Sequence, residues 1–156
     1  MRILAIGVGN ILRTDDGVGL HVLKRIKEVK PDVDTVDVGL GSLEILEYMQ
    51  GYDIVYIIDA IETGGKPGTV YKVNLTNGKS PPIITHCHGV DLVSIIKLGQ
   101  LLYQEKLPKK IILLAVEAED ILTLNEEPTK KVKQSIEEVV KEIINPHSQE
   151  FEKYLL

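Results

Sequence analysis

Hydrophobic runs alternate with segments of helical periodicity along most of the chain. Continuous apolar runs at 2–9, 53–61 and 109–119 are typical of strands that are buried on both faces of a sheet. A shorter strand is expected at 32–39. In the segment 68–75, apolar and polar residues alternate with a period of two, which predicts a partly exposed edge strand.

Between the strands, apolar residues recur at the three- and four-residue spacing of amphipathic helices. The first helix follows Thr14 or Asp15, either of which can cap it, and a short second helix follows Gly41 with Ser42 as its cap. A third helix starts at about His88, and a fourth closes the chain. The residues expected to face the core from the three longer helices are Val18, Val22, Ile26, Val29, Leu92, Ile95, Ile96, Leu102, Val132, Ile136, Val139, Val140 and Ile143.

This order of elements predicts the fold class. Strands that alternate with helices form an α/β three-layer sandwich, here with a mostly parallel, twisted sheet of about five strands. A chain of 156 residues that is 44% hydrophobic can bury one ordinary core but not two. We therefore expect a single domain at 1–145, followed by a loosely attached tail at 146–156.

Charge and composition narrow the possible partners. The formal net charge of -5 and the interspersed Lys and Glu residues argue against a basic nucleic-acid-binding face. No apolar run approaches about 18 residues, and no signal-peptide pattern precedes the first strand, so we expect no membrane insertion and a cytoplasmic protein. The single Cys87 excludes an internal disulfide framework. Because no exposed apolar surface is recognisable in the sequence, a monomer is expected.

The segment "GVGNILRTDDGVG" at 7–19 combines a nucleotide-style glycine pair with two adjacent carboxylates. A dinucleotide fingerprint needs a third small residue where Leu12 stands, and Asp15 and Asp16 would repel a pyrophosphate. Asp37, at the end of the second strand, could imitate the ribose-binding acid of such proteins and keeps this alternative open. The segment as a whole favours a metal site.

A second carboxylate, Asp59, ends the apolar run of the third strand, where it would be costly unless hydrogen-bonded or metal-bound. Suppose that the first and third strands are neighbours, with the second strand on the far side of the first. The order of the strands then reverses between the first and third strands, and the side chain of Asp59 lies near those of Asp15 and Asp16 at that point. The loop "THCHG" could bring His86 or His88 to the same carboxyl ends of the strands. Two carboxylates and one imidazole leave coordination positions open for a substrate or water.

Each of these residues also has a purely structural interpretation. Asp15 or Asp16 could cap the first helix and oppose the positive end of its dipole. His86 and His88 could be solvated loop residues. Cys87 could be a small apolar filler, because adjacent residues of an extended loop point in opposite directions and all three are not expected to bind one ion.

Taken in order, five motifs resemble the [NiFe]-hydrogenase maturation endopeptidases over nearly the whole chain. They are the segment at 7–19, "IIDAI" at 57–61, "PGTV" at 67–70, a loop histidine before an apolar helix, and "LAVEAE" at 114–119. The first motif is the specific one. The resemblance implies a phosphorylase/hydrolase-like α/β fold and the removal of a C-terminal peptide from a hydrogenase large-subunit precursor once nickel has been inserted.

Carried over residue by residue, the resemblance makes Asp16, Asp59 and His88 the catalytic and metal-binding residues. His88 is preferred to His86, because apolar residues follow it at the spacing usual in the family. The second strand is followed by "VGLGS" at 38–42, in place of the family's glycine-threonine segment, which leaves the identity of the partner hydrogenase open.

The mechanism implied by the resemblance is nickel sensing. Three protein ligands bind free nickel modestly, but they can complete the coordination of nickel that is already seated in the precursor. The resting enzyme is then either metal-free or holds another divalent ion. Two alternatives stay open: a nickel-binding chaperone without peptidase activity would use the same ligands, and a Rossmann-like dinucleotide-binding protein would use Gly7, Gly9 and Asp37.

Overall fold

Five strands form a single sheet in the order β2-β1-β3-β5-β4 in the computed structural model, which describes residues 1–78 and 92–146. β2, β1, β3 and β5 are parallel, and β4 runs antiparallel to β5 at one edge. The mostly parallel sheet and the edge strand were both predicted from the sequence, and both are confirmed. The strands are β1 at Ile3–Gly7, β2 at Asp34–Asp37, β3 at Ile54–Ile61, β4 at Val70–Asn74 and β5 at Lys110–Glu117.

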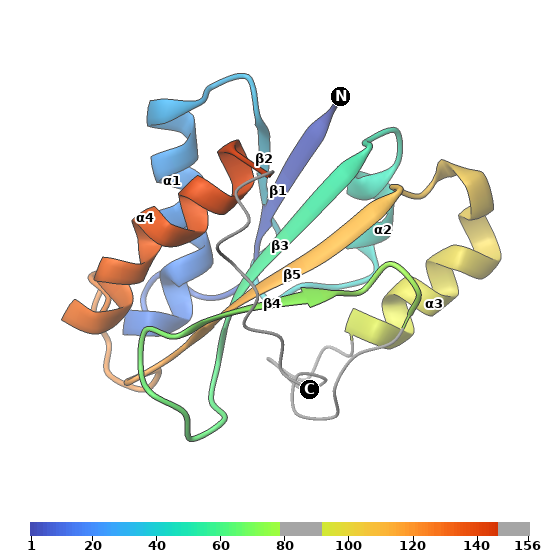
Figure 1. Ribbon diagram of the computed structural model, residues 1–156. Coiled ribbons are helices and arrows are strands. Elements are labelled where there is room, and N and C mark those ends of the chain that lie inside the picture. The colour runs from blue at the N-terminus through green and yellow to red at the C-terminus, as the bar shows by residue number, and fades with distance from the viewer. Residues whose placement is uncertain (79–91, 147–156) are drawn as a thin grey trace.

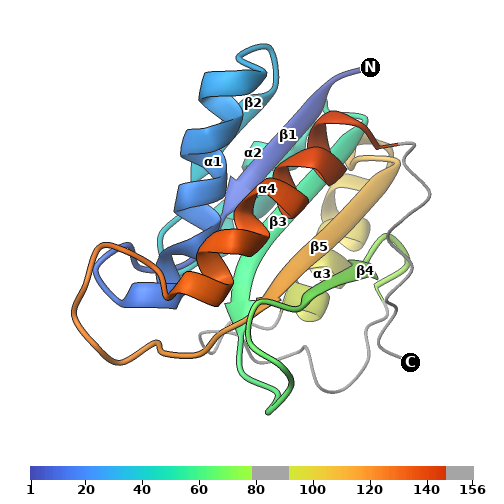
Figure 2. The same ribbon diagram turned by 60° about the vertical axis from the view of Figure 1, so that its left-hand side comes forward.

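Helices cover both faces of the sheet, so the predicted three-layer α/β sandwich is confirmed (Figure 1). α1 and α4 lie side by side on one face, and α2 and α3 lie on the other (Figures 1 and 2). The short 3-10 turn η1 precedes α1, and the short 3-10 turn η4 follows α3. The bounds are η1 at Thr14–Gly17, α1 at Val18–Val29, α2 at Glu44–Met49, α3 at Leu92–Tyr103, η4 at Gln104–Lys106 and α4 at Lys130–Ile144.

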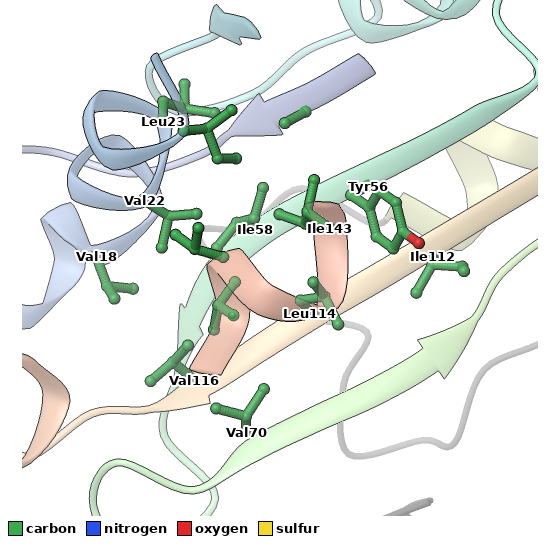
Figure 3. Close-up of a cluster of buried hydrophobic side chains, with 14 of the residues drawn as sticks. Val18, Val22, Leu23, Tyr56, Ile58, Val70, Ile112, Leu114, Val116 and Ile143 are labelled. Atoms are coloured by element: carbon green, nitrogen blue, oxygen red, sulfur yellow. The ribbon is translucent and has the colours of Figure 1, made fainter. Parts of the chain in front are cut away.

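The core has one layer on each side of the sheet, because successive residues of a strand point to opposite faces. All eight residues of β3 are buried, as expected of a strand with a helix layer on both sides. Ile58 packs in the layer under α1 and α4, together with Val22, Leu114 and Ile143 (Figure 3). Ile57, one residue earlier, belongs to the layer that includes α2 and α3.

Two residues that the helical periodicity placed in the core are exposed. Val29 is the last residue of α1, and Leu102 lies in the last turn of α3. The periodicity of a helix gives the direction of its apolar face, but it does not tell where the underlying sheet ends. These two predictions were therefore wrong for a geometric reason that the sequence does not contain.

Within the two described ranges, no helix is both long enough and apolar enough to cross a bilayer.

Candidate functional site

The glycines of the segment after β1 allow a close approach of backbone to backbone. Gly9 has φ +132°, and a Cβ atom there would lie 1.9 Å from the carbonyl oxygen of Asp16. A Cβ on Gly19, in the first turn of α1, would lie 2.6 Å from the carbonyl oxygen of Ile58 in β3. The segment therefore folds back on itself, and α1 starts directly against the strand ends. Close packing accounts for these glycines without a bound phosphate.

Asp16 lies in η1, at the carboxyl end of β1, and its side chain is almost completely buried. The Asp16 carboxylate accepts a hydrogen bond of 2.9 Å from the backbone N–H of Asn10. This bond links the turn that leaves β1 to the turn that enters α1. It fixes one carboxylate at the edge of the sheet where the parallel strands end.

Asp59 lies near the carboxyl end of β3, in register with Ala115 of β5. Only 1% of Asp59 and 2% of Asp16 are exposed, so both carboxylates are held inside the protein rather than at its surface. β1 and β3 are neighbours, with β2 on the far side of β1, as the sequence argument required. η1 packs against β3. The strand-order reversal therefore lies between the strands that lead to Asp16 and to Asp59.

Asp15 has a different role from the one predicted. The N-cap of α1 is Gly17, with no side-chain hydrogen bond, so the expectation that Thr14, Asp15 or Asp16 caps this helix was wrong. The interposed η1 turn separates these side chains from the first turn of α1. The buried Asp15 carboxylate instead accepts hydrogen bonds from the backbone N–H groups of Glu119, Asp120 and Thr129, at 2.8, 3.0 and 2.7 Å.

Thr14 is held in a left-handed backbone conformation, with φ 52°. This conformation is costly for a β-branched residue and persists only where the surroundings impose it. The Thr14 backbone N–H donates to the carbonyl of Asn125 at 2.9 Å, and its hydroxyl donates to the carbonyl of Thr123 at 2.6 Å. The loop between β5 and α4 thus sets the conformation of the residue just before Asp15 and Asp16. Nothing in the sequence signals this long-range contact.

Glu117, the last residue of β5, is a fourth buried acid at this edge of the sheet, after Asp15, Asp16 and Asp59. Its carboxylate accepts hydrogen bonds from the backbone N–H and the hydroxyl of Thr63 and from the backbone N–H of Gly65. These donors belong to the loop between β3 and β4. Glu117 therefore anchors that loop, and the sequence argument, which treated it only as part of a motif, missed this role.

The histidine candidates and Cys87 lie outside the described residues, so His86 and His88 stay predictions. α3 begins at Leu92 in the described part of the chain, and its amino-terminal end points toward the carboxyl edge of the sheet (Figure 1). Among the described residues, no group of three His, Cys, Asp or Glu side chains is arranged to hold a metal ion.

Asp37, the residue that kept the dinucleotide alternative open, is used locally. Its carboxylate accepts a hydrogen bond of 2.8 Å from the backbone N–H of Gly39, two residues further along the same loop. Such a bond is the ordinary role of an aspartate at the start of a turn. It gives no support to a ribose-binding role.

Comparison with known proteins identifies the family to which the chain belongs. A sequence model of the hydrogenase maturation proteases matches residues 20–146. The chain is 33% identical over 128 residues to a hydrogenase 2 maturation protease from Escherichia coli, an alignment that covers 78% of this chain and 76% of that protein. The chain belongs to the hydrogenase maturation protease family. As a member, it is an endopeptidase that acts in hydrogenase maturation.

Solved structures of hydrogenase maturation proteases have the same architecture. The hydrogenase maturating endopeptidase HybD from Escherichia coli superimposes with a TM-score of 0.73 at 27% identity, over 92% of this chain and 90% of that one. A hydrogenase 2 maturation peptidase from a Thaumarchaeota archaeon gives a TM-score of 0.68 at 25% identity, over 94% and 97% of the two chains. The family and the fold expected from the sequence are thus both confirmed.

Proposed function

We propose that this protease removes the C-terminal segment of a [NiFe]-hydrogenase large-subunit precursor after nickel insertion. We propose further that Asp16, Asp59 and His88 detect the nickel by coordinating it. The observation that supports it best is the position of two buried carboxylates, Asp16 and Asp59, at the carboxyl ends of neighbouring parallel strands. Ligands of open α/β sheets bind at this kind of strand-order reversal.

The chemistry of the donor set suits a metal that arrives with the substrate. Carboxylate and imidazole are both ligands of nickel, and a site with only three protein ligands keeps positions open. Nickel seated in the precursor is then part of the substrate. When bound, the ion can polarise the scissile carbonyl or lower the pKa of an attacking water. Asp16 and Asp59 would orient it from their buried positions at the strand ends.

His88 is proposed as the third ligand because of its place before α3. The side chain of Asp59 points to the same face of the sheet as Ile57 and Ile61, and this face is the one that α3 covers. His88 precedes Leu92, the first described residue of α3, by four positions in the sequence. Replacing His88 with Ala should therefore abolish processing, whereas His86→Ala should retain most of it, and the reverse result would move the ligand to His86.

A nickel-binding chaperone would use the same residues and leave the precursor's length unchanged, but membership in a family of proteases argues against it. A dinucleotide-binding protein would respond to neither nickel nor precursor, and its key acid, Asp37, is already bonded within its own loop.

Mass spectrometry of the precursor after incubation with metal-depleted enzyme tests the proposal. Nickel-loaded precursor should lose its C-terminal segment, whereas nickel-free precursor should keep its full length even with enzyme in excess. Efficient cleavage of nickel-free precursor would refute the nickel-sensing step and leave the peptidase assignment standing. An unchanged mass of nickel-loaded precursor would contradict the proposed substrate.

A further inference from the structure

Three of the exposed leucines at the carboxyl edge of the sheet lie on two loops that are joined to each other. Leu122 and Leu124, in the loop between β5 and α4, are 77% and 80% exposed, and Leu12, in the segment between β1 and η1, is 50% exposed. We call these three residues the leucine patch. Single exposed apolar residues are ordinary, whereas exposed apolar residues gathered in one place mark interaction sites.

The two segments that carry the leucine patch are joined by backbone hydrogen bonds. Arg13 and Asn125 form an isolated parallel β-bridge. The Asn125 N–H donates to the carbonyl of Leu12, and the Thr14 N–H donates to the carbonyl of Asn125, both at 2.9 Å. In parallel register the residues just before each bridge partner lie next to each other, so Leu12 and Leu124 are neighbours. Figure 2 shows the loop before α4 (orange) beside the segment before α1 (blue).

The leucines project from a well-ordered framework of hydrogen bonds. The Asp120 carboxylate accepts hydrogen bonds from the N–H groups of Leu122 and Thr123, at 2.9 and 3.0 Å. The Thr123 side chain first, and then these two backbone bonds, lower the pKa of Asp120. Asp15 fixes the beginning and the end of the same loop through Glu119 and Thr129. A surface that is held in place before binding loses little conformational entropy when a partner docks.

The charge around the patch indicates the complementary surface. The loop at 118–129 contains Glu119, Asp120, Glu126 and Glu127 and no Lys or Arg. Glu127 is paired with Lys133, and the neighbouring segment adds one exposed cation, Arg13, so the surroundings of the patch stay acidic on balance. A partner with an apolar centre and a basic rim would match a leucine patch with acidic surroundings.

We infer that the leucine patch is the docking surface for the body of the precursor whose C-terminal segment is cleaved, an inference that rests on the proposed function. The loops that carry the patch follow β1 and β5, and Asp16 and Asp59 lie at the same edge of the sheet. If the C-terminus of a folded precursor lies at these carboxylates, the rest of the precursor contacts the surface around the carboxyl ends of the strands. Apolar contact there would hold the precursor while its basic rim meets the acidic loop.

The test compares the variant Leu122→Ser/Leu124→Ser with Leu101→Ser. Leu101, on α3, is also 77% exposed, but it lies near the end of α3, toward the amino ends of the parallel strands where β5 starts. With nickel-loaded precursor as the probe, the double variant should raise Kd and KM on the order of tenfold and leave kcat nearly unchanged. Leu101→Ser should leave all three constants as they are.

The possible outcomes separate this inference from the proposed function. An unchanged Kd in the folded double variant, or an equal loss in Leu101→Ser, would overturn the docking surface even if wild-type enzyme still shortens the precursor. Wild-type enzyme that neither binds nor shortens the precursor would overturn both. Circular dichroism spectra and melting temperatures identify variants that have lost their fold, and Leu124→Met, which keeps an apolar side chain, should retain wild-type Kd.

Discussion

The carboxylate of Asp15 accepts hydrogen bonds from both the backbone N–H and the hydroxyl of Thr129, at 2.7 and 3.0 Å. Asp15 lies in the turn before α1, and Thr129 is the residue before α4. One buried side chain therefore joins the starts of the two helices that cover one face of the sheet. Its neighbour Asp16 points to a different environment, so the two adjacent aspartates have separate roles.

Replacing Asp15 with Asn should lower the free energy of unfolding by about 2 to 4 kcal/mol, because an amide NH₂ would face donors that need an acceptor. Urea unfolding measures this loss. Asp16→Asn is the comparison variant: the backbone N–H of Asn10 donates to this carboxylate at 2.9 Å, and we expect a loss of about 1 kcal/mol. Equal losses in the two variants would contradict the division of roles.

Replacing Gly9 with Ala should displace the turn that carries Asp16, because the added Cβ would lie 1.9 Å from the Asp16 carbonyl oxygen. We expect lower stability and greatly reduced processing. Gly64→Ala is the control, since Gly64 also has a positive φ, +79°, but has open space around the added atom. This control should cost about 1 kcal/mol and leave processing intact. Similar behaviour of the two variants would show that the contact with Asp16 is unimportant.

Replacing Lys72 with Met should leave the carboxylate of Glu142 uncompensated. Lys72 donates to one oxygen of this fully buried side chain, and the other oxygen has no hydrogen-bond partner among the described residues. Removing one partner of a buried pair costs about 3 kcal/mol, measurable by urea unfolding.

Lys133→Met is the control for Lys72→Met, because Lys133 pairs with Glu127 at 3.0 Å in an exposed position. It should cost less than about 1 kcal/mol. Adding Glu142→Gln to Lys72→Met should recover part of the lost stability. A double variant less stable than Lys72→Met alone would argue against an uncompensated charge.

Tyr56 should titrate well above the usual range of a tyrosine. Burial, and then the nearby carboxylate of Glu142, raise the pKa of Tyr56 to about 12. An unfolded tyrosine has a pKa of about 10, so between these values the folded state keeps a proton that the unfolded state releases, and stability falls as pH rises through this window. In an ultraviolet absorbance titration, the transition with the highest pKa should be missing from the Tyr56→Phe variant. Its persistence would assign that transition to another tyrosine.

The parts of the fold that could be predicted are those that a local pattern determines. The apolar run that forms β3 fixed both its burial and the position of Asp59 at its carboxyl end. The sequence argument assumed that β1 and β3 are neighbours with β2 beyond β1, and the structure has that arrangement. It did not predict the partner strands of β4 and β5.

The parts that escaped prediction depend on contacts between distant segments. The doublet of Asp15 and Asp16 looks like a helix cap in sequence, because the donors that bind Asp15 come from residues more than 100 positions away. The anchoring role of Glu117 and the strained backbone of Thr14 depend on loops in the same way. The choice between His86 and His88 rests on the family resemblance and on spacing.

The measurement that tests the central claim most directly is the mass of nickel-loaded precursor after incubation with Asp16→Asn or Asp59→Asn enzyme. Asp53→Asn, at the other end of β3, is the matched control. If the two buried carboxylates form the processing site, both site variants should slow removal of the C-terminal segment by more than about 100-fold, while the control stays at the wild-type rate. Wild-type rates in folded Asp16→Asn and Asp59→Asn enzymes would contradict the account.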